Sequence, residues 1–284
     1  MTKRVVGMTN RDTEMMKSDS GMTKFRHPHE DGEANSHPII PRPLTAHEML
    51  QVWERGQGQH PVERALTMLS VACPEMTREA LASLSIGQRD ACLLALREAV
   101  FGPQLVSMAH CPQCHERLEQ TFAVEDIREP VVTTSSLPLA VETAECVVQF
   151  RLPNSQDLAA IAQCVDAGEA RRRLVRRCVV EVTRAGQPYS IDQLPESSVE
   201  AMAQRMSQAD PQSDIQLALS CPLCAHEWQE SFDIVSFFWS ELTAWATRMV
   251  NQVYRLASVY GWREADILAM SPWRREAYLS VVGT

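Results

Sequence analysis

The sequence lacks any uninterrupted run of 18 apolar residues, so it contains no segment typical of a transmembrane helix. Its first residues include basic side chains, but no apolar core of the kind that a secretory signal needs. We therefore expect an intracellular, reducing environment. The nine cysteines would there serve as core thiols or metal ligands more often than as disulfides.

The sequence is also short of positive charge. It has 27 Lys and Arg against 36 Asp and Glu, which gives a net charge of −9, whereas domains that bind nucleic acid are usually basic. The G-x-S-x-G, H-E-x-x-H and P-loop patterns are absent as well. These absences disfavour nucleic-acid binding and several common classes of enzyme.

What is present indicates an α+β protein that is mainly helical. Residues 1–44 are polar and predict a disordered arm, in which His27, His29 and His37 could bind metal but more simply belong to a solvated tail. Capping-box patterns at Thr45 and Ser85 begin helices of an N-terminal helical bundle over 45–104. Residues 235–284 repeat apolar side chains three or four apart, which predicts a C-terminal helical region.

A repeat divides the rest of the chain. CPQC at 111–114 and CPLC at 221–224 each follow an apolar run and precede a segment ending in Phe-x-(Val/Ile), with apolar side chains at a period of two. Each copy therefore predicts a strand, a cysteine turn and a second strand. The hairpins cover 105–127 and 215–234, and an α/β insertion over 128–214 separates them. Its arginine-rich segment 170–178 predicts a solvated helix face.

Three interpretations of the paired motifs compete. A thioredoxin-like redox site places C-x-x-C at a helix N-terminus, where the dipole lowers the thiol pKa, whereas strands follow both motifs here. Disulfides within each motif would close very short loops and stabilise little. One zinc ion bound by four thiolates explains the repeat, because such tetrahedral sites are structural and leave no position for a catalytic water.

We therefore expect one structural Zn²⁺ per chain in a split zinc ribbon formed by two β-hairpin knuckles. Its ligands are Cys111, Cys114, Cys221 and Cys224. The halves are 106 residues apart, which is tolerable because the cost of loop closure rises only logarithmically with length. The flanking histidines His110, His115 and His226 are expected at the surface. Cys73 and Cys92 in the helical region are expected as buried core thiols.

Four segments carry a family resemblance: LSIGQRDACLLALREAVFG, FRLPNSQDL, DPQSDIQLALSCPLCAHEWQESFDIVSFFWSEL and YGWREADILAMSPWRREAYLSVV. Over roughly residues 60–284 the chain resembles the T-even-type phage baseplate hub assembly chaperone family and its relatives in contractile injection systems. The resemblance implies a non-enzymatic role in assembling the baseplate, with hub, spike or wedge proteins as partners. The net charge and the lack of a long apolar run add the expectation of neither nucleic-acid binding nor membrane insertion. The resemblance also implies a protein of the bacterial host cytoplasm, and leaves open whether the protein stays in the phage-tail-like particle.

Two questions stay open at this point. Tryptophan and arginine are enriched at protein interfaces, so partner-binding candidates are named in the C-terminal region: Trp239, Trp245, Trp262, Trp273, Arg274 and Arg275. The same tryptophans could equally belong to the core. Zinc ribbons also occur in nucleic-acid-binding or transcription-associated modules, and this alternative function is opposed by the net charge of −9.

Overall fold

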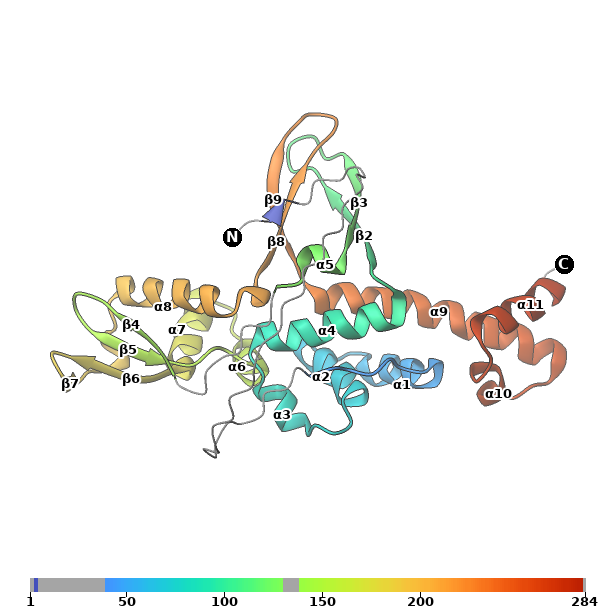
Figure 1. The fold of residues 1–284 in the computed structure, drawn as a ribbon, viewed down its shortest axis with the longest axis horizontal. Helices are drawn as coiled ribbons and strands as arrows, with labels where there is room; N and C mark the ends of the chain where they lie inside the picture. Colours follow the sequence, from blue (N-terminus) through green and yellow to red (C-terminus); the bar gives the residue numbers. More distant parts are fainter. Residues whose placement is uncertain (1–2, 5–38, 130–137, 283–284) are drawn as a thin grey trace, which may run out of the picture.

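The computed structural model describes residues 3–4, 39–129 and 138–282, and shows a mixed α/β protein dominated by helices (Figure 1). The helices are α1 (Ala46–Gly56), α2 (Pro61–Ala72), α3 (Arg78–Ser83), α4 (Ile86–Phe101), α5 (Val124–Ile127), α6 (Ser155–Ile161), α7 (Ala167–Cys178), α8 (Glu196–Ala209), α9 (Ile234–Tyr260), α10 (Glu264–Leu268) and α11 (Pro272–Val282), with 3-10 turns at Ile191–Gln193 and Pro211–Ser213. The strands are β1 (Lys3–Arg4), β2 (Gln104–His110), β3 (Arg117–Ala123), β4 (Leu139–Glu142), β5 (Val147–Phe150), β6 (Val179–Arg184), β7 (Gln187–Pro188), β8 (Ile215–Ser220) and β9 (Glu227–Phe232). None of the helices in the described ranges combines the length and the apolar character that a membrane crossing requires.

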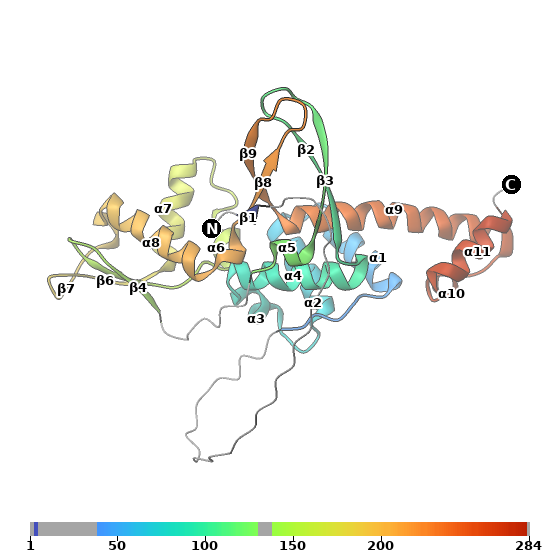
Figure 2. The same ribbon diagram turned by 45° about the horizontal axis from the view of Figure 1, so that its top comes forward.

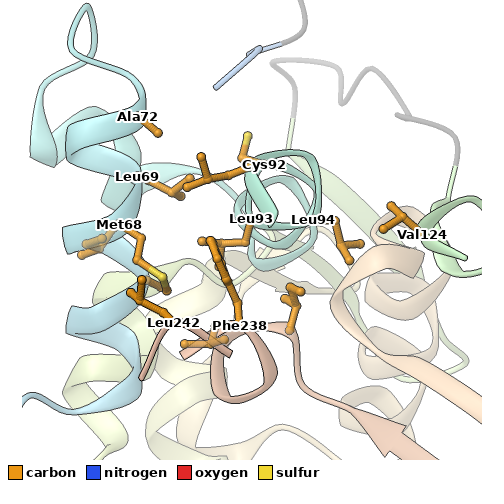
Figure 3. Packing of buried hydrophobic residues seen from close by; sticks show 14 of the residues in the cluster. Met68, Leu69, Ala72, Cys92, Leu93, Leu94, Val124, Phe238 and Leu242 are labelled. Carbon is orange, nitrogen blue, oxygen red and sulfur yellow. The ribbon is translucent and has the colours of Figure 1, made fainter. Parts of the chain in front are cut away.

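The main core lies between α2, α4 and the first half of α9 (Figure 3). Met68 and Leu69 of α2 meet Leu93 of α4, and Phe238 and Leu242 of α9 close the other side. All five side chains are buried. Because each buried side chain of this size contributes about 1.5–3 kcal/mol, this layer fixes the position of α9 against the N-terminal helices.

Local sequence signals explain where these helices begin. Thr45 and Glu48 form a reciprocal capping box before α1, and Ser85 and Gln88 form another before α4. Both were predicted from the sequence, and both satisfy backbone N–H groups that the first helical turn leaves free. Pro61 starts α2 at a position where its missing N–H costs nothing.

The disordered arm was predicted over residues 1–44, but residues 39–44 are ordered against the helical bundle. Ile39 and Leu44 pack against the main core, and the Arg42 N–H donates to the carbonyl of Ala72. These contacts bury apolar side chains and satisfy a backbone donor, so the segment is held on the bundle. Within the arm, Lys3–Arg4 forms a strand, and the three histidines lie outside the described residues.

The insertion builds a four-stranded antiparallel sheet in the order β4-β5-β6-β7, covered by α8. Its core, which includes Val148, Phe150 and Met202, is separate from the main core. Figures 1 and 2 place this sheet at the end of the molecule opposite α10 and α11. Strand β4 was not predicted from the sequence.

The C-terminal helices form a projection. α9 runs for 27 residues, and its second half extends beyond the bundle, where α10 and α11 pack at its end (Figures 1 and 2). Gly261 ends α9 in the left-handed conformation with φ of 69°, as the sequence predicted. Leu256, Ile267 and Leu279 hold the three helices together through a small cluster of buried side chains.

Candidate metal centre

Two matching hairpins stand above the bundle (Figures 1 and 2). β2 and β3 pair antiparallel from Gln104↔Ala123 to His110↔Arg117, and β8 and β9 pair from Ile215↔Phe232 to Ser220↔Glu227. The predicted strand, turn and strand are therefore present in both copies of the repeat. The base of each hairpin is anchored in the main core, by Leu105 and Phe122 in the first and by Leu217 and Phe232 in the second.

The two cysteine turns have the same backbone hydrogen bonds. The Cys111 N–H donates to the carbonyl of Glu116 at 2.9 Å, and the His115 N–H donates to the carbonyl of Cys111 at 2.9 Å. In the second turn Cys221 bonds to His226, and Ala225 to Cys221, both at 2.9 Å. The residue after the second cysteine has a positive φ in both turns, 61° at His115 and 56° at Ala225. This left-handed residue, unusual for a non-glycine, lets each turn curl around its pair of sulfurs.

The four sulfur atoms meet between the hairpins. Cys111 Sγ lies 3.6 Å from Cys224 Sγ, and Cys114 Sγ lies 3.6 Å from Cys221 Sγ. All four sulfurs lie within 4.8 Å of one another. A disulfide would require about 2.05 Å between sulfurs, whereas ligands at about 2.3 Å around a tetrahedral zinc would be roughly 3.8 Å apart. The observed spacing is compatible with a metal site, and all four cysteines are free thiols in the structure.

The protonation of this cluster supports the same chemistry. Although burial favours the neutral Cys111 thiol, hydrogen bonds from the N–H groups of Cys114 and Gln113 outweigh it and lower the Cys111 pKa to about 7. At Cys114, the Glu116 N–H favours the thiolate, but desolvation and the neighbouring sulfurs raise the pKa to about 12. Of these two thiols, Cys111 therefore loses its proton more easily, and Cys114 resists further negative charge. A dication would remove that resistance.

The remaining cysteines and histidines fall near the positions expected of them. Cys73 and Cys92 are buried in the bundle, and burial raises the pKa of the Cys92 thiol to about 12. His110 and His115 are exposed, while His226 is half-buried with its ring stacked on Trp228. The four cysteines are the potential metal-binding group found among the described residues.

The tryptophan candidates divide between core and surface. Trp239 and Trp245 are half-buried against the main core. Gly56 lies so close to Trp239 that a Cβ there would come within 2.2 Å of its ring. Trp262 is half-buried and stacks on Tyr260 with ring centroids 4.4 Å apart. Trp273 is 88% exposed.

The two neighbouring arginines behave differently from one another. Arg274 is exposed, with its guanidinium 5.7 Å from the ring centroid of Tyr278. Arg275 is only 5% exposed, and its guanidinium donates to the carbonyl of Met270 at 2.5 Å. The expectation that Arg275 binds a partner does not fit this burial, because its donors already hold the loop between α10 and α11.

Sequence reasoning missed a second cluster of charge in the insertion. Asp157 is fully buried and accepts hydrogen bonds from Arg151 and Arg177. The local signal was only the capping position that Asp157 occupies after Asn154. Nothing in the spacing indicated that α7 would bring Arg177 to the same carboxylate.

The geometry can now be compared with known proteins. The family described as T4 bacteriophage base plate protein matches residues 42–239. The chain belongs to this family. The matched region of this T4-type baseplate protein includes both hairpins and all four clustered cysteines, whereas most of α9 and all of α10 and α11 follow it. Among curated proteins and among solved structures, none matches the chain.

Proposed function

We propose that the protein is a non-enzymatic, zinc-binding assembly or structural protein of a contractile-tail baseplate. The observation that carries the proposal is the match to the T4 base plate protein family over residues 42–239. Its partners would be the hub, spike or wedge proteins of the baseplate. We infer that it acts in the cytoplasm of the bacterial host and becomes part of, or helps to complete, the particle.

In this proposal, zinc would hold the two hairpins together. Cys111 and Cys114 would hold the ion from the first hairpin, and Cys221 and Cys224 from the second. The ion would join the tips of the two hairpins, whose bases lie beside the end of α4 and the start of α9. Four thiolates close the coordination shell, so the site would have no position for a reacting water.

The C-terminal projection is the proposed partner surface. Trp273 is 88% exposed and Arg274 is exposed beside it on α11. Exposed tryptophan and arginine are the residue types that most often dominate interface energies. The projection also lies away from the insertion (Figure 1), so both ends of the molecule can be engaged at once.

The decisive experiment combines gene deletion with matched cysteine variants. We expect deletion of the gene to stop baseplate completion, and the wild-type gene to restore it. Cys224→Ser should lose bound zinc and fail to restore assembly, while Cys164→Ser, a free half-buried cysteine in the insertion, should behave as wild type. Normal particles after gene deletion would contradict the baseplate role. Absence of zinc from purified wild-type protein would contradict the metal site alone.

The alternative function as a nucleic-acid-binding module has no support beyond the proposed zinc ribbon. Phosphate binding needs clustered positive charge, and the net charge is −9. A binding measurement with DNA and RNA at low salt would detect such a function, and we expect no measurable binding.

A further inference from the structure

The strands of the two hairpins differ in how their outer edges are protected. An edge strand presents unpaired N–H and C=O groups, which proteins commonly block with charged side chains or a covering segment. β3 carries Arg117 and Glu119, and β9 carries Glu227 and Glu230. β2 and β8, which occupy equivalent places in the repeat, contain no Asp, Glu, Lys or Arg. These two strands therefore depend on a covering segment.

β8 has such a segment, and β2 has none that the structure describes. β1 pairs parallel with β8, with Lys3 beside Leu217 and Arg4 beside Ala218. Within residues 3–4, 39–129 and 138–282, β2 pairs with β3 alone. Among the described residues, this uncharged strand of seven residues has one edge without a partner strand.

β2 also exposes apolar side chains beside this edge. Val106 is 52% exposed and Met108 is 41% exposed, and both lie on the outward face of the hairpin. Exposed apolar residues scattered singly need no explanation. Two of them in succession along one face of an unguarded edge strand mark a site of strand association.

The order of side chains along β2 indicates which strand would associate. The outward face reads Gln104, Val106, Met108 and His110, so polar ends flank an apolar centre. If two antiparallel β2 strands meet about a two-fold axis at Ser107, Val106 lies opposite Met108 of the second copy, and Gln104 lies opposite His110 of the second copy. In this register, apolar residues of one β2 strand face apolar residues of the other, and polar residues face polar residues. Because β2 contains no Asp, Glu, Lys or Arg, the two strands do not repel one another by charge.

We propose that β2 is the site at which two copies of this chain join, by antiparallel β2–β2 pairing. The pairing makes one continuous four-stranded sheet with β3 of each copy at its outside. It satisfies the open backbone groups and places Val106 of each copy against Met108 of the other. An interface of one strand pair is smaller than that of a stable dimer, so the association depends on protein concentration.

Sedimentation velocity of the full chain, purified with zinc, tests the proposal over a wide concentration range. The wild type should shift from monomer to dimer as concentration rises. In Val106→Lys/Met108→Lys each lysine faces a lysine of the second copy, so the dimer should disappear. In Val106→Lys/Met108→Glu each lysine faces a glutamate in the proposed register, so the dimer should return although the same two apolar side chains are missing.

Thr121→Lys is the matched control. Thr121 pairs with Val106 on the outward face, but it lies on β3 and away from the β2 edge, so this variant should dimerise as the wild type does. Equal zinc content and circular dichroism in all four proteins would show that the variants fold. The proposal is overturned by a wild type that stays monomeric, by a dimer that survives the two lysines, or by a lysine–glutamate variant that fails to dimerise.

Discussion

At the scale of single residues, Asp157 joins three segments of the insertion. Its carboxylate has no exposed area, and it accepts hydrogen bonds from Arg151 after β5, from Arg177 of α7 and from the Asn154 N–H at the start of α6. Burial alone would favour the neutral acid, but these hydrogen bonds outweigh it and lower the pKa of Asp157. The carboxylate is thus charged and fully engaged at neutral pH.

We expect Asp157→Asn to destabilise the protein strongly. Breaking a buried ion pair by removing one partner costs about 3–5 kcal/mol, and the lower end applies because both arginines are partly exposed to water. Urea unfolding of the purified protein measures the change. Asp192→Asn is the matched control, since Asp192 pairs with Arg176 at the surface of the same insertion with both side chains exposed, and such pairs contribute about 0–1 kcal/mol. Equal losses in the two variants would contradict this role of Asp157.

At the scale of secondary-structure elements, the start of α1 depends on a charged cap. The Glu48 carboxylate accepts hydrogen bonds from the Thr45 N–H at 2.9 Å and from Arg42 at 3.0 Å. The hydrogen bond from Arg42, helped by those from Thr45, lowers the pKa of Glu48 to about 2. Because the folded pKa lies below the unfolded one, the carboxylate stabilises the fold above about pH 4.5, and this contribution is lost as the pH falls toward 2.

Glu48→Gln should therefore lower the free energy of unfolding by roughly 1 kcal/mol at neutral pH. The difference from wild type should shrink as the pH falls below about 4. Glu54→Gln on the same helix is the control, because Glu54 is exposed and forms no ion pair with a described residue. Thermal unfolding at several pH values measures both, and a pH-independent difference would show that the charge of Glu48 is not the cause.

Elements differ in how far the sequence could predict them. The caps at Thr45 and Ser85, the stop at Gly261 and both cysteine hairpins were predicted, because each signal lies within a few residues of the feature that it creates. The Asp157 cluster, the burial of Arg275 and strand β4 were not. Each depends on which segments pack together, and local propensity does not contain that information. The proximity of cysteines separated by 106 residues was predicted only because the same motif, CPQC and CPLC, occurs in both hairpins.

At the scale of the whole molecule, the hairpins have two separate supports. Their bases are anchored in the main core through Leu105, Phe122, Leu217 and Phe232, while the four cysteines meet at their tips. The core would remain if zinc were removed, but the cysteine turns would lose their main link and keep a small apolar cluster around Leu118 and Trp228. Loss of metal should therefore loosen one region first instead of unfolding the entire chain.

A chelator with limited proteolysis tests this order of events. We expect zinc removal to produce early cleavage within the turns at 111–116 and 221–226, while the far-UV circular dichroism of the helices changes little. Cys224→Ser without chelator should give the same early cleavage, because three thiolates bind zinc far more weakly than four. Cys164→Ser should resist cleavage until chelator is added, as wild type does. Identical cleavage of wild type with and without chelator would show that no metal supports the tips, and simultaneous loss of helix signal would show that the hairpin bases depend on the ion as well.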